Sequence, residues 1–457
     1  MWRASNRTIP RRFGLTELIL AILALSVVFA LVAIKKLEEE RDEWKDRLLI
    51  TLKSTSDAAR ASDKRLRQAV ELLKEGDDRM TSLSLANLES SNRQKSSIVD
   101  SPLEINNNDN FAEVNGKTTV ILFCYSRSDY LKRTLQSLSS RLDSAVNFRK
   151  NGLRIIISQD GYDGSVREVS QQFASEMNSK GINAEHIQHV RTDSRDKGHM
   201  ASYYALSAHY SKGLDYAFRD GSERAIILED DLELAVDFFP YFESFSGLLE
   251  NDDSLLAVSA WNDHGQVSFV ADSRRLYRTD IFPGLGWMLT DRVWQELKPK
   301  WPLAFWDDWL REPAQRKGRH VIRPEVSRTT TFGASGGASQ GQFFDKYLHT
   351  MKLNDVDVRF TKAEIDAMSK QAFDEWFMRK VQQAKQVESP AQIPQNSQEG
   401  YRIVYTSVRH FMNLAPSIGI MDDVKAGSPR GAYRGILPIT YRNTLLYIVP
   451  QNIPSLD

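Results

Sequence analysis

The feature that most constrains the fold is an alternation of apolar runs and amphipathic stretches that begins at Thr118. The apolar runs predict buried strands, and the stretches between them have the length and periodicity of helices. Strands that alternate with helices in this way predict an α/β fold built on a parallel sheet, in which ligands bind beyond the carboxyl ends of the strands. The predicted strands are TTVILFCY, LRIIISQD, HIQHV, RAIILEDD and LLAVSAW.

Polar side chains stand at the ends of several of these strands. Arg127 follows the first strand, Asp160 ends the second, and Glu229, Asp230 and Asp231 end the fourth. Three adjacent carboxylates repel one another, and a divalent cation that also bridges phosphates needs only one or two protein carboxylates. The alternative is a solvated acidic turn, but the position after a buried strand favours a metal site. Arg127 and Asp160 would suit a diphosphate or a nucleoside.

A second pair of carboxylates, Asp307 and Asp308, lies between Trp306 and Trp309. Partial desolvation by the indole rings would raise the pKa of a carboxylate toward that of a useful general base. Aromatic faces also suit the apolar faces of sugar rings. The alternative, which the pattern alone favours, is an exposed amphipathic turn whose tryptophans pack inward.

Two further features leave their roles open. Residues 331–341 form a glycine-rich run without a lysine or the spacing of a P-loop, so the run is either a lid over substrate or a plain surface loop. His209 lies on a predicted helix beside Tyr210. A helix histidine with its hydrogen bonds satisfied is the commoner role for such a residue.

The N-terminal part predicts a membrane anchor. Residues 18–34 are apolar except for Ser26, and extension back to Phe13 gives a segment long enough to cross a hydrocarbon core of about 30 Å. A cleaved signal peptide has a shorter apolar core and a small-residue cleavage site, so we expect the anchor to stay uncleaved. Basic residues flank the run on both sides, and positive-inside counting therefore does not decide the orientation.

The rest of the chain divides by composition. The charged segment after the anchor predicts a stalk helix with possible self-association, although its apolar seam is too broken for a coiled coil. A linker rich in Ser, Asn and Asp follows it. The predicted organisation is a cytoplasmic tail (1–12), a transmembrane signal-anchor (13–34), a stalk and linker (35–116), a catalytic domain (117–348), a linker (349–370) and a small C-terminal domain (371–457).

Composition excludes some classes of protein and site. Lys plus Arg and Asp plus Glu both number 60, so the chain lacks the basic excess of a general nucleic-acid binder. Cys124 is the only cysteine, which excludes an intrachain disulfide and a cysteine-based zinc site.

Several long stretches resemble glycosyltransferase family 13, from about Thr118 to the C-terminus. The resemblance implies a GT-A catalytic domain in a type II Golgi membrane protein with a lumenal catalytic domain. It also implies an inverting, Mn²⁺-dependent transfer of N-acetylglucosamine from UDP-N-acetylglucosamine to a terminal α-mannose of an N-glycan core, in β1,2 linkage, at the start of hybrid and complex N-glycan synthesis. The stretches are ILEDDLELAVDFFPYF, VSAWNDHG, LYRTDIFPGLGWML, PKWPLAFWDDW, RKGRHVIRPEVSRTTTFG, GQFFD and MDDVKAGSPRGAYRG.

The resemblance also implies roles for single residues. Asp231 is expected to ligate Mn²⁺ and Asp307 to act as the catalytic base. The remaining matches are expected to contact the donor. Glu229 and Asp230 would contact its sugars, Arg127, Asp160 and His209 its nucleotide part, and Ala338 and Ser339 lie in a loop that orders over it.

The chain departs from the family pattern at two places. The glycine-rich loop carries one extra residue, with Gln340 where a histidine is expected, and the cysteines that form disulfides in animal relatives are absent. Both departures leave the acidic motif and the WDDW motif intact. Two alternatives stay open, namely an enzyme that adds the same β1,2-linked sugar to O-mannosyl glycans on proteins and a catalytically silent glycan-binding Golgi protein.

Overall fold

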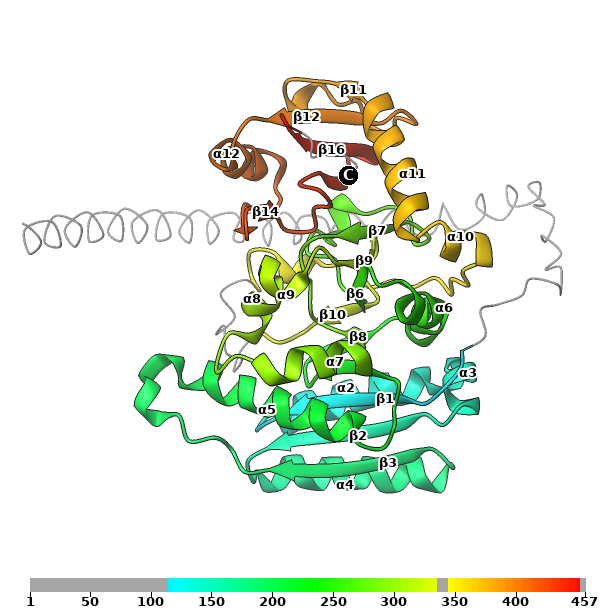
Figure 1. The fold of residues 1–457 in the computed structure, drawn as a ribbon, viewed down its shortest axis with the longest axis vertical. Coiled ribbons are helices and arrows are strands. Elements are labelled where there is room, and N and C mark those ends of the chain that lie inside the picture. The colour runs from blue at the N-terminus through cyan, green and yellow to red at the C-terminus, as the bar shows by residue number, and fades with distance from the viewer. Residues whose placement is uncertain (1–113, 335–343, 453–457) are drawn as a thin grey trace, which may run out of the picture. The chain divides into compact units, whose positions relative to one another are not determined.

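The computed structural model describes residues 114–334 and 344–452 (Figure 1). Within these two segments no helix is both long enough and apolar enough to cross a membrane. The predicted anchor, stalk and most of the linker, and also Ala338 and Ser339, lie outside the described residues.

The main sheet has eight strands in the order β3-β2-β1-β4-β8-β6-β9-β7. Its first half is parallel, as predicted, because β1 pairs in parallel with β2 and β4, and β2 with β3. The bounds of these four strands are Thr118–Cys124 (β1), Arg154–Asp160 (β2), Asn183–His189 (β3) and Arg224–Glu229 (β4).

The second half of the sheet is mixed, so the prediction of a parallel sheet is wrong there. β8 is antiparallel to both β4 and β6, and β7 is antiparallel to β9. Both β7 and β8 are four residues long, which is too short for a clear periodicity. The bounds are Leu255–Ser259 (β6), Leu276–Thr279 (β7), Trp287–Thr290 (β8) and His320–Pro324 (β9).

Helices cover both faces of the parallel half, which explains why every residue of β1 and β2 is buried. Val120 and Leu122 belong to the core shared with α2 (Ser128–Arg141) and α4 (Gly164–Ser179). Ile121 and Phe123 point to the other face and pack with α5 (Ala201–Phe218) and α7 (Asp291–Leu297). Gly213 lets α5 approach β1 closely, because a Cβ there would lie 2.4 Å from the Phe123 ring.

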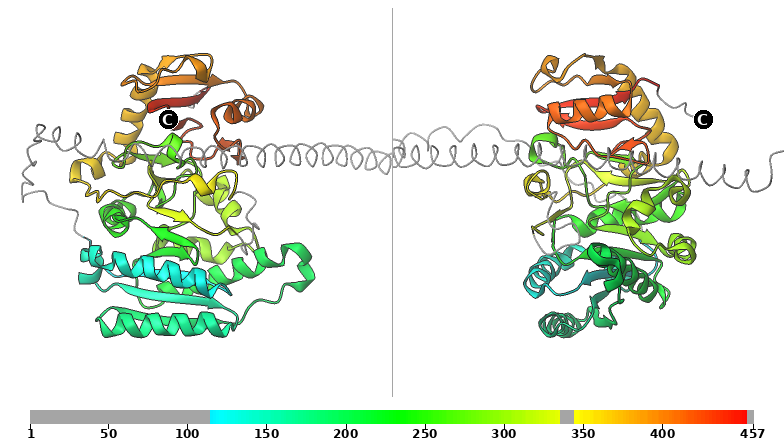
Figure 2. Two further views of the ribbon diagram at one scale, coloured as in Figure 1. Left: turned by 180° about the vertical axis from the view of Figure 1, so that it is seen from behind. Right: turned by 90° about the vertical axis from the view of Figure 1, so that its left-hand side faces the viewer.

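A four-stranded sheet, in the order β11-β12-β16-β15, lies in the C-terminal part of the same compact unit (Figure 2). Its core joins that of the main sheet, because Tyr433 and Tyr447 pack in one cluster with Leu122. The predicted domain boundaries stay predictions. The strands are Lys385–Gln386 (β11), Tyr401–Tyr405 (β12), Leu437–Tyr441 (β15) and Thr444–Pro450 (β16), with the helices Lys370–Gln383 (α11) and Val408–Ile418 (α12).

Shorter elements connect the two sheets and position the site. The ribbon of β5 (Leu232–Leu234) and β10 (Thr329–Thr331) starts directly after the acidic triplet. The hairpin of β13 (Val424–Lys425) and β14 (Ser428–Pro429) follows α12. The remaining helices are Val146–Lys150 (α3), Phe238–Asn251 (α6), Trp306–Arg311 (α8), Pro313–Arg316 (α9) and Lys362–Asp366 (α10).

Candidate active site

The acidic triplet lies at the carboxyl end of β4, where the sequence places it. Arg127, from the loop after the neighbouring strand β1, forms ion pairs with both Asp230 and Asp231, the second at 2.9 Å to Oδ2. These three side chains are mostly buried, with 21%, 6% and 12% of their surfaces exposed. The structure therefore excludes the alternative of a solvated acidic turn and brings Arg127 to the triplet.

Burial disfavours the ionised forms of the carboxylates in this triplet. Burial and the charge of Asp231 raise the pKa of Glu229 to about 7. Burial also raises the pKa of Asp230 to about 6, although the Arg127 guanidinium acts to lower it. Among the described residues, Arg127 pairs with two of these three carboxylates, and a metal cation would stabilise their ionised forms.

The carboxylates of the triplet fit a metal ion that takes most of its ligands from a bound substrate and only one or two from the protein. Within the described residues, no three His, Cys, Asp or Glu side chains converge to form a metal site on their own. Asp231 lies against the segment that leads into the glycine-rich loop. The Phe332 amide donates to the Asp231 carbonyl at 3.0 Å, and a Cβ on Gly333 would lie 2.2 Å from Asp231 Oδ2.

Asp160 ends β2, and His209 extends from α5 to Ser158 of the same strand. Asp160 is buried, which raises its pKa, and forms an ion pair with Arg191. Arg191 also lies 3.8 Å from the centre of the Tyr125 ring. His209 Nε2 is 2.9 Å from Ser158 Oγ, and burial holds the pKa of this histidine well below its usual value. The geometry of His209 is that of a satisfied helix histidine, and its contact with the donor stays a prediction.

Tyr210 connects the acidic triplet to helix α8, a role that the sequence analysis missed. Its hydroxyl donates to Glu229 Oε1 at 2.7 Å. Its ring stacks on Phe123 at 4.1 Å on one side and on Trp306 at 4.3 Å on the other. The sequence placed Tyr210 on a predicted helix but carried no signal for its bond to Glu229, because that bond joins two elements.

Trp306 packs inward, as the alternative interpretation of this motif predicted. Besides Tyr210, it stacks on Trp287 and Trp301, with ring centres 5.9 and 5.8 Å apart. Trp306 is therefore part of the core and does not offer its face to a sugar. Asp307, the next residue, is carried on the first turn of α8, which follows the left-handed residue Phe305 (φ 53°).

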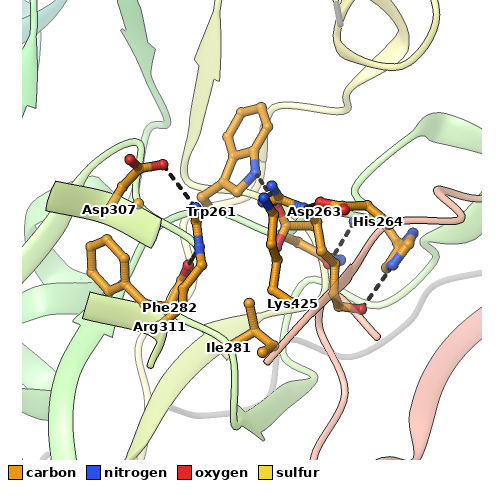
Figure 3. Close-up of polar contacts among 12 residues, drawn as sticks. Trp261, Asp263, His264, Ile281, Phe282, Asp307, Arg311 and Lys425 are labelled. Atoms are coloured by element: carbon orange, nitrogen blue, oxygen red, sulfur yellow. Dashed lines mark hydrogen bonds and ion pairs between the residues drawn. The ribbon is translucent and has the colours of Figure 1, made fainter. Parts of the chain in front are cut away.

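Both carboxylates of the WDDW motif are held by one arginine, Arg311, which Figure 3 shows between Asp307 and Phe282. Arg311 Nη1 donates to Asp307 Oδ2 at 2.8 Å and to Asp308 Oδ1 at 2.9 Å, and Arg311 Nε donates to the Phe282 carbonyl at 3.0 Å. Arg311 is buried, whereas the two carboxylates are 43% and 45% exposed. Asp307 is thus a solvent-accessible carboxylate in a fixed orientation.

The expected rise in pKa from the tryptophans is not found at Asp308. Burial acts to raise the pKa of this carboxyl, but Arg311 and Lys425 outweigh burial and lower it below its ordinary value. The prediction was wrong because the sequence analysis did not identify Arg311 as the cation that holds Asp307 and Asp308. Its spacing of three and four residues from the two aspartates was the available signal.

An α/β sheet with an acidic turn at the end of a central strand, and a second oriented carboxylate on a nearby helix, is the arrangement expected of a glycosyltransferase. The chain belongs to the GNT-I family, whose profile matches residues 30–455. The resemblance inferred from the sequence is therefore confirmed.

A curated relative and two solved structures are also similar to this chain. The alpha-1,3-mannosyl-glycoprotein 2-beta-N-acetylglucosaminyltransferase of Arabidopsis thaliana is 38% identical over 343 residues, which are 74% of this chain and 75% of that protein. A mannosyltransferase from Pyrobaculum calidifontis in complex with GDP-Man and Mn²⁺ is 13% identical, with a TM-score of 0.32, and the match covers 47% of this chain and 58% of the other. The inositol-1-phosphate CTP transferase from T. maritima is 9% identical, with a TM-score of 0.27 and coverages of 47% and 86%. Because both TM-scores lie below 0.5, we draw nothing from either structure.

Proposed function

We propose that this chain transfers N-acetylglucosamine from UDP-N-acetylglucosamine to the 2-position of a terminal α-mannose of N-glycans, in β linkage and with inversion. Membership in the GNT-I family and the name of the Arabidopsis relative support the sugar and the acceptor. The observation that carries the proposal is that the structure connects the triplet Glu229–Asp231 to the oriented Asp307. Tyr210 makes the connection, because its hydroxyl bonds to Glu229 and its ring stacks on Trp306, the residue before Asp307.

The two carboxylate groups of this site would act on different substrates, Asp231 on the donor and Asp307 on the acceptor. Asp231 would hold Mn²⁺, which when bound supplies Lewis-acid stabilisation of the diphosphate leaving group. Asp307 would accept the proton of the mannose hydroxyl as that oxygen attacks the anomeric carbon and the bond to the diphosphate breaks. A single in-line displacement inverts the anomeric centre, and the orientation of Asp307 by Arg311 fixes the face from which the acceptor attacks.

A transfer assay on the full-length protein in detergent tests this proposal. UDP-N-acetylglucosamine and an oligomannose N-glycan should give a β1,2-linked product with Mn²⁺ and no product after chelation of the metal. An O-mannosyl peptide is the matched second acceptor. Preference for that peptide would support the O-mannose alternative. Donor binding with neither hydrolysis of the donor nor transfer to any acceptor would support a silent glycan-binding protein.

We propose further that the chain is a single-pass type II protein of the Golgi membrane, with the catalytic part in the lumen. The apolar run at 18–34 supports a single membrane span, and the family resemblance supports the type II orientation. The only N-x-S/T sequence, Asn6-Arg7-Thr8, would then be cytosolic and unmodified. Protease treatment of intact vesicles should leave the C-terminal part undigested until detergent is added. Digestion without detergent would contradict the topology.

A further inference from the structure

The stretch MDDVKAGSPRGAYRG has no role in the proposed function, yet the structure brings it to the proposed base. Lys425, in this stretch, places its Nζ 3.1 Å from Oδ1 and 3.3 Å from Oδ2 of Asp308, which neighbours Asp307. Asp307 and Asp308 accept from the same nitrogen of Arg311. A sugar whose hydroxyl reaches Asp307 therefore lies close to Asp308 and Lys425 as well.

The position of Lys425 is set by the backbone around it rather than by its ion pair. Lys425 pairs with Ser428 across a tight hairpin, whose turn residues Ala426 (φ 48°) and Gly427 (φ 81°) are both left-handed. A two-residue turn with two positive φ angles is a favoured hairpin geometry. Arg430, just after the hairpin, fixes its base, because Nε lies 2.5 Å from Asp423 Oδ2 and the carbonyl lies 2.9 Å from His264 Nε2.

The ion pair itself contributes little to the fold. The side chain of Lys425 is 32% exposed and that of Asp308 is 45% exposed. Exposed ion pairs are weak because water competes for both charges. The hairpin does not need this pair to stay in place, and sugar hydroxyls can replace either partner at low cost.

Buried polar atoms without partners lie next to Arg430, at the base of the hairpin. Asp263 is 3% exposed and His264 is 1% exposed. Within the described part of the chain, Asp263 Oδ2 and His264 Nδ1 have no hydrogen-bond partner. Buried polar atoms normally have one, so these two atoms indicate that water or a polar ligand binds here. Arg430 links both residues to the hairpin, because its Nη1 lies 3.5 Å from Asp263 Oδ1 and its carbonyl lies 2.9 Å from His264 Nε2.

We propose that Lys425 and Asp308 form a subsite for hydroxyl groups of the acceptor glycan, so that the C-terminal hairpin takes part in acceptor selection. The inference rests on the proposed function, because it names the acceptor side of the same site. Sugar hydroxyls both donate and accept hydrogen bonds, which matches an ammonium donor next to carboxylate acceptors. Lys425 is a specificity-determining residue in this arrangement and takes no part in the proton transfer.

Kinetics of Lys425→Met in the full-length protein test the subsite. The KM for the mannosyl acceptor should rise about 10- to 100-fold, the usual effect of deleting a hydrogen bond to a charged group. The affinity for UDP-N-acetylglucosamine with Mn²⁺, and the slow hydrolysis of this donor without acceptor, should stay unchanged. Lys425→Arg keeps the charge and should recover part of the loss. The matched control is Lys385→Met, since Lys385 also pairs with a carboxylate, Glu399 at 2.5 Å, on the C-terminal sheet.

Acceptors that lack single hydroxyls sharpen the test. One deoxy analogue of the terminal mannose should be a poor acceptor for the wild-type protein and should show no further loss with Lys425→Met, because both changes remove the same contact. A wild-type acceptor KM in Lys425→Met, or a loss confined to kcat, would overturn the subsite while leaving the proposed function standing. A wild-type protein that transfers nothing to mannose would overturn both.

Discussion

Replacement of Asp231 by Ala is expected to abolish metal-dependent donor binding and leave the protein folded. Asp231 is the member of the triplet that lies against the Phe332–Gly333 segment. A bound metal commonly contributes several kcal/mol to the stabilisation of phosphate charge, so the affinity gained from Mn²⁺ should fall by at least about 100-fold. Arg127 keeps Asp230 as a partner in the variant, and the loss of one carboxylate relieves repulsion within the triplet.

Calorimetric titration with UDP-N-acetylglucosamine, with and without Mn²⁺, measures this effect. Thermal unfolding of the metal-free variant should show a midpoint equal to or slightly above that of the wild type. Asp253→Ala is the matched control, because Asp253 is an 89% exposed aspartate that also pairs with an arginine, Arg292. Wild-type affinity in Asp231→Ala would mean that the metal is held by other residues.

The parallel half of the sheet could be predicted because its strands are continuous apolar runs. β1 and β2 are buried along their whole length, and such strands are recognisable without any partner. β7 and β8 could not be predicted in the same way. Their direction depends on which strands they pair with, and four residues carry too little pattern to decide it.

The candidate site was predictable where its residues are adjacent in the sequence or follow predicted strands. The triplet Glu229–Asp231 was visible as three carboxylates after a strand. Arg127 reaches these carboxylates across 103 residues, and Lys425 reaches Asp308 across 117. Contacts at such separations come from the topology of the sheet and from the docking of the C-terminal part. No local periodicity reports them. The position of Arg127 after a strand and the family resemblance both pointed to Arg127, but neither gave a role to Lys425.

Asp307→Asn is expected to lower turnover by about two to four orders of magnitude, the usual contribution of general-base catalysis. The amide oxygen of the variant can still accept from Arg311, which stays bonded to Asp308 and to the Phe282 carbonyl. The shape of the site is therefore retained, and the variant loses the ability to take up the acceptor's proton. Donor and Mn²⁺ should bind with nearly wild-type affinity, because none of their predicted contacts comes from α8.

The neighbouring aspartate provides the control for this assignment. Asp308 accepts from the same nitrogen of Arg311 as Asp307 does, and the side chains of Asp307 and Asp308 are 43% and 45% exposed. Its side chain is also bonded to Lys425, so that Asp308→Asn should act mainly on the KM for the acceptor. At saturating acceptor, Asp308→Asn should keep most of its kcat while Asp307→Asn does not, since only the residue that accepts the proton limits the chemical step. The reverse pattern, with Asp308→Asn nearly inactive and Asp307→Asn close to wild type, would move the base to Asp308 and place Lys425 in direct contact with it.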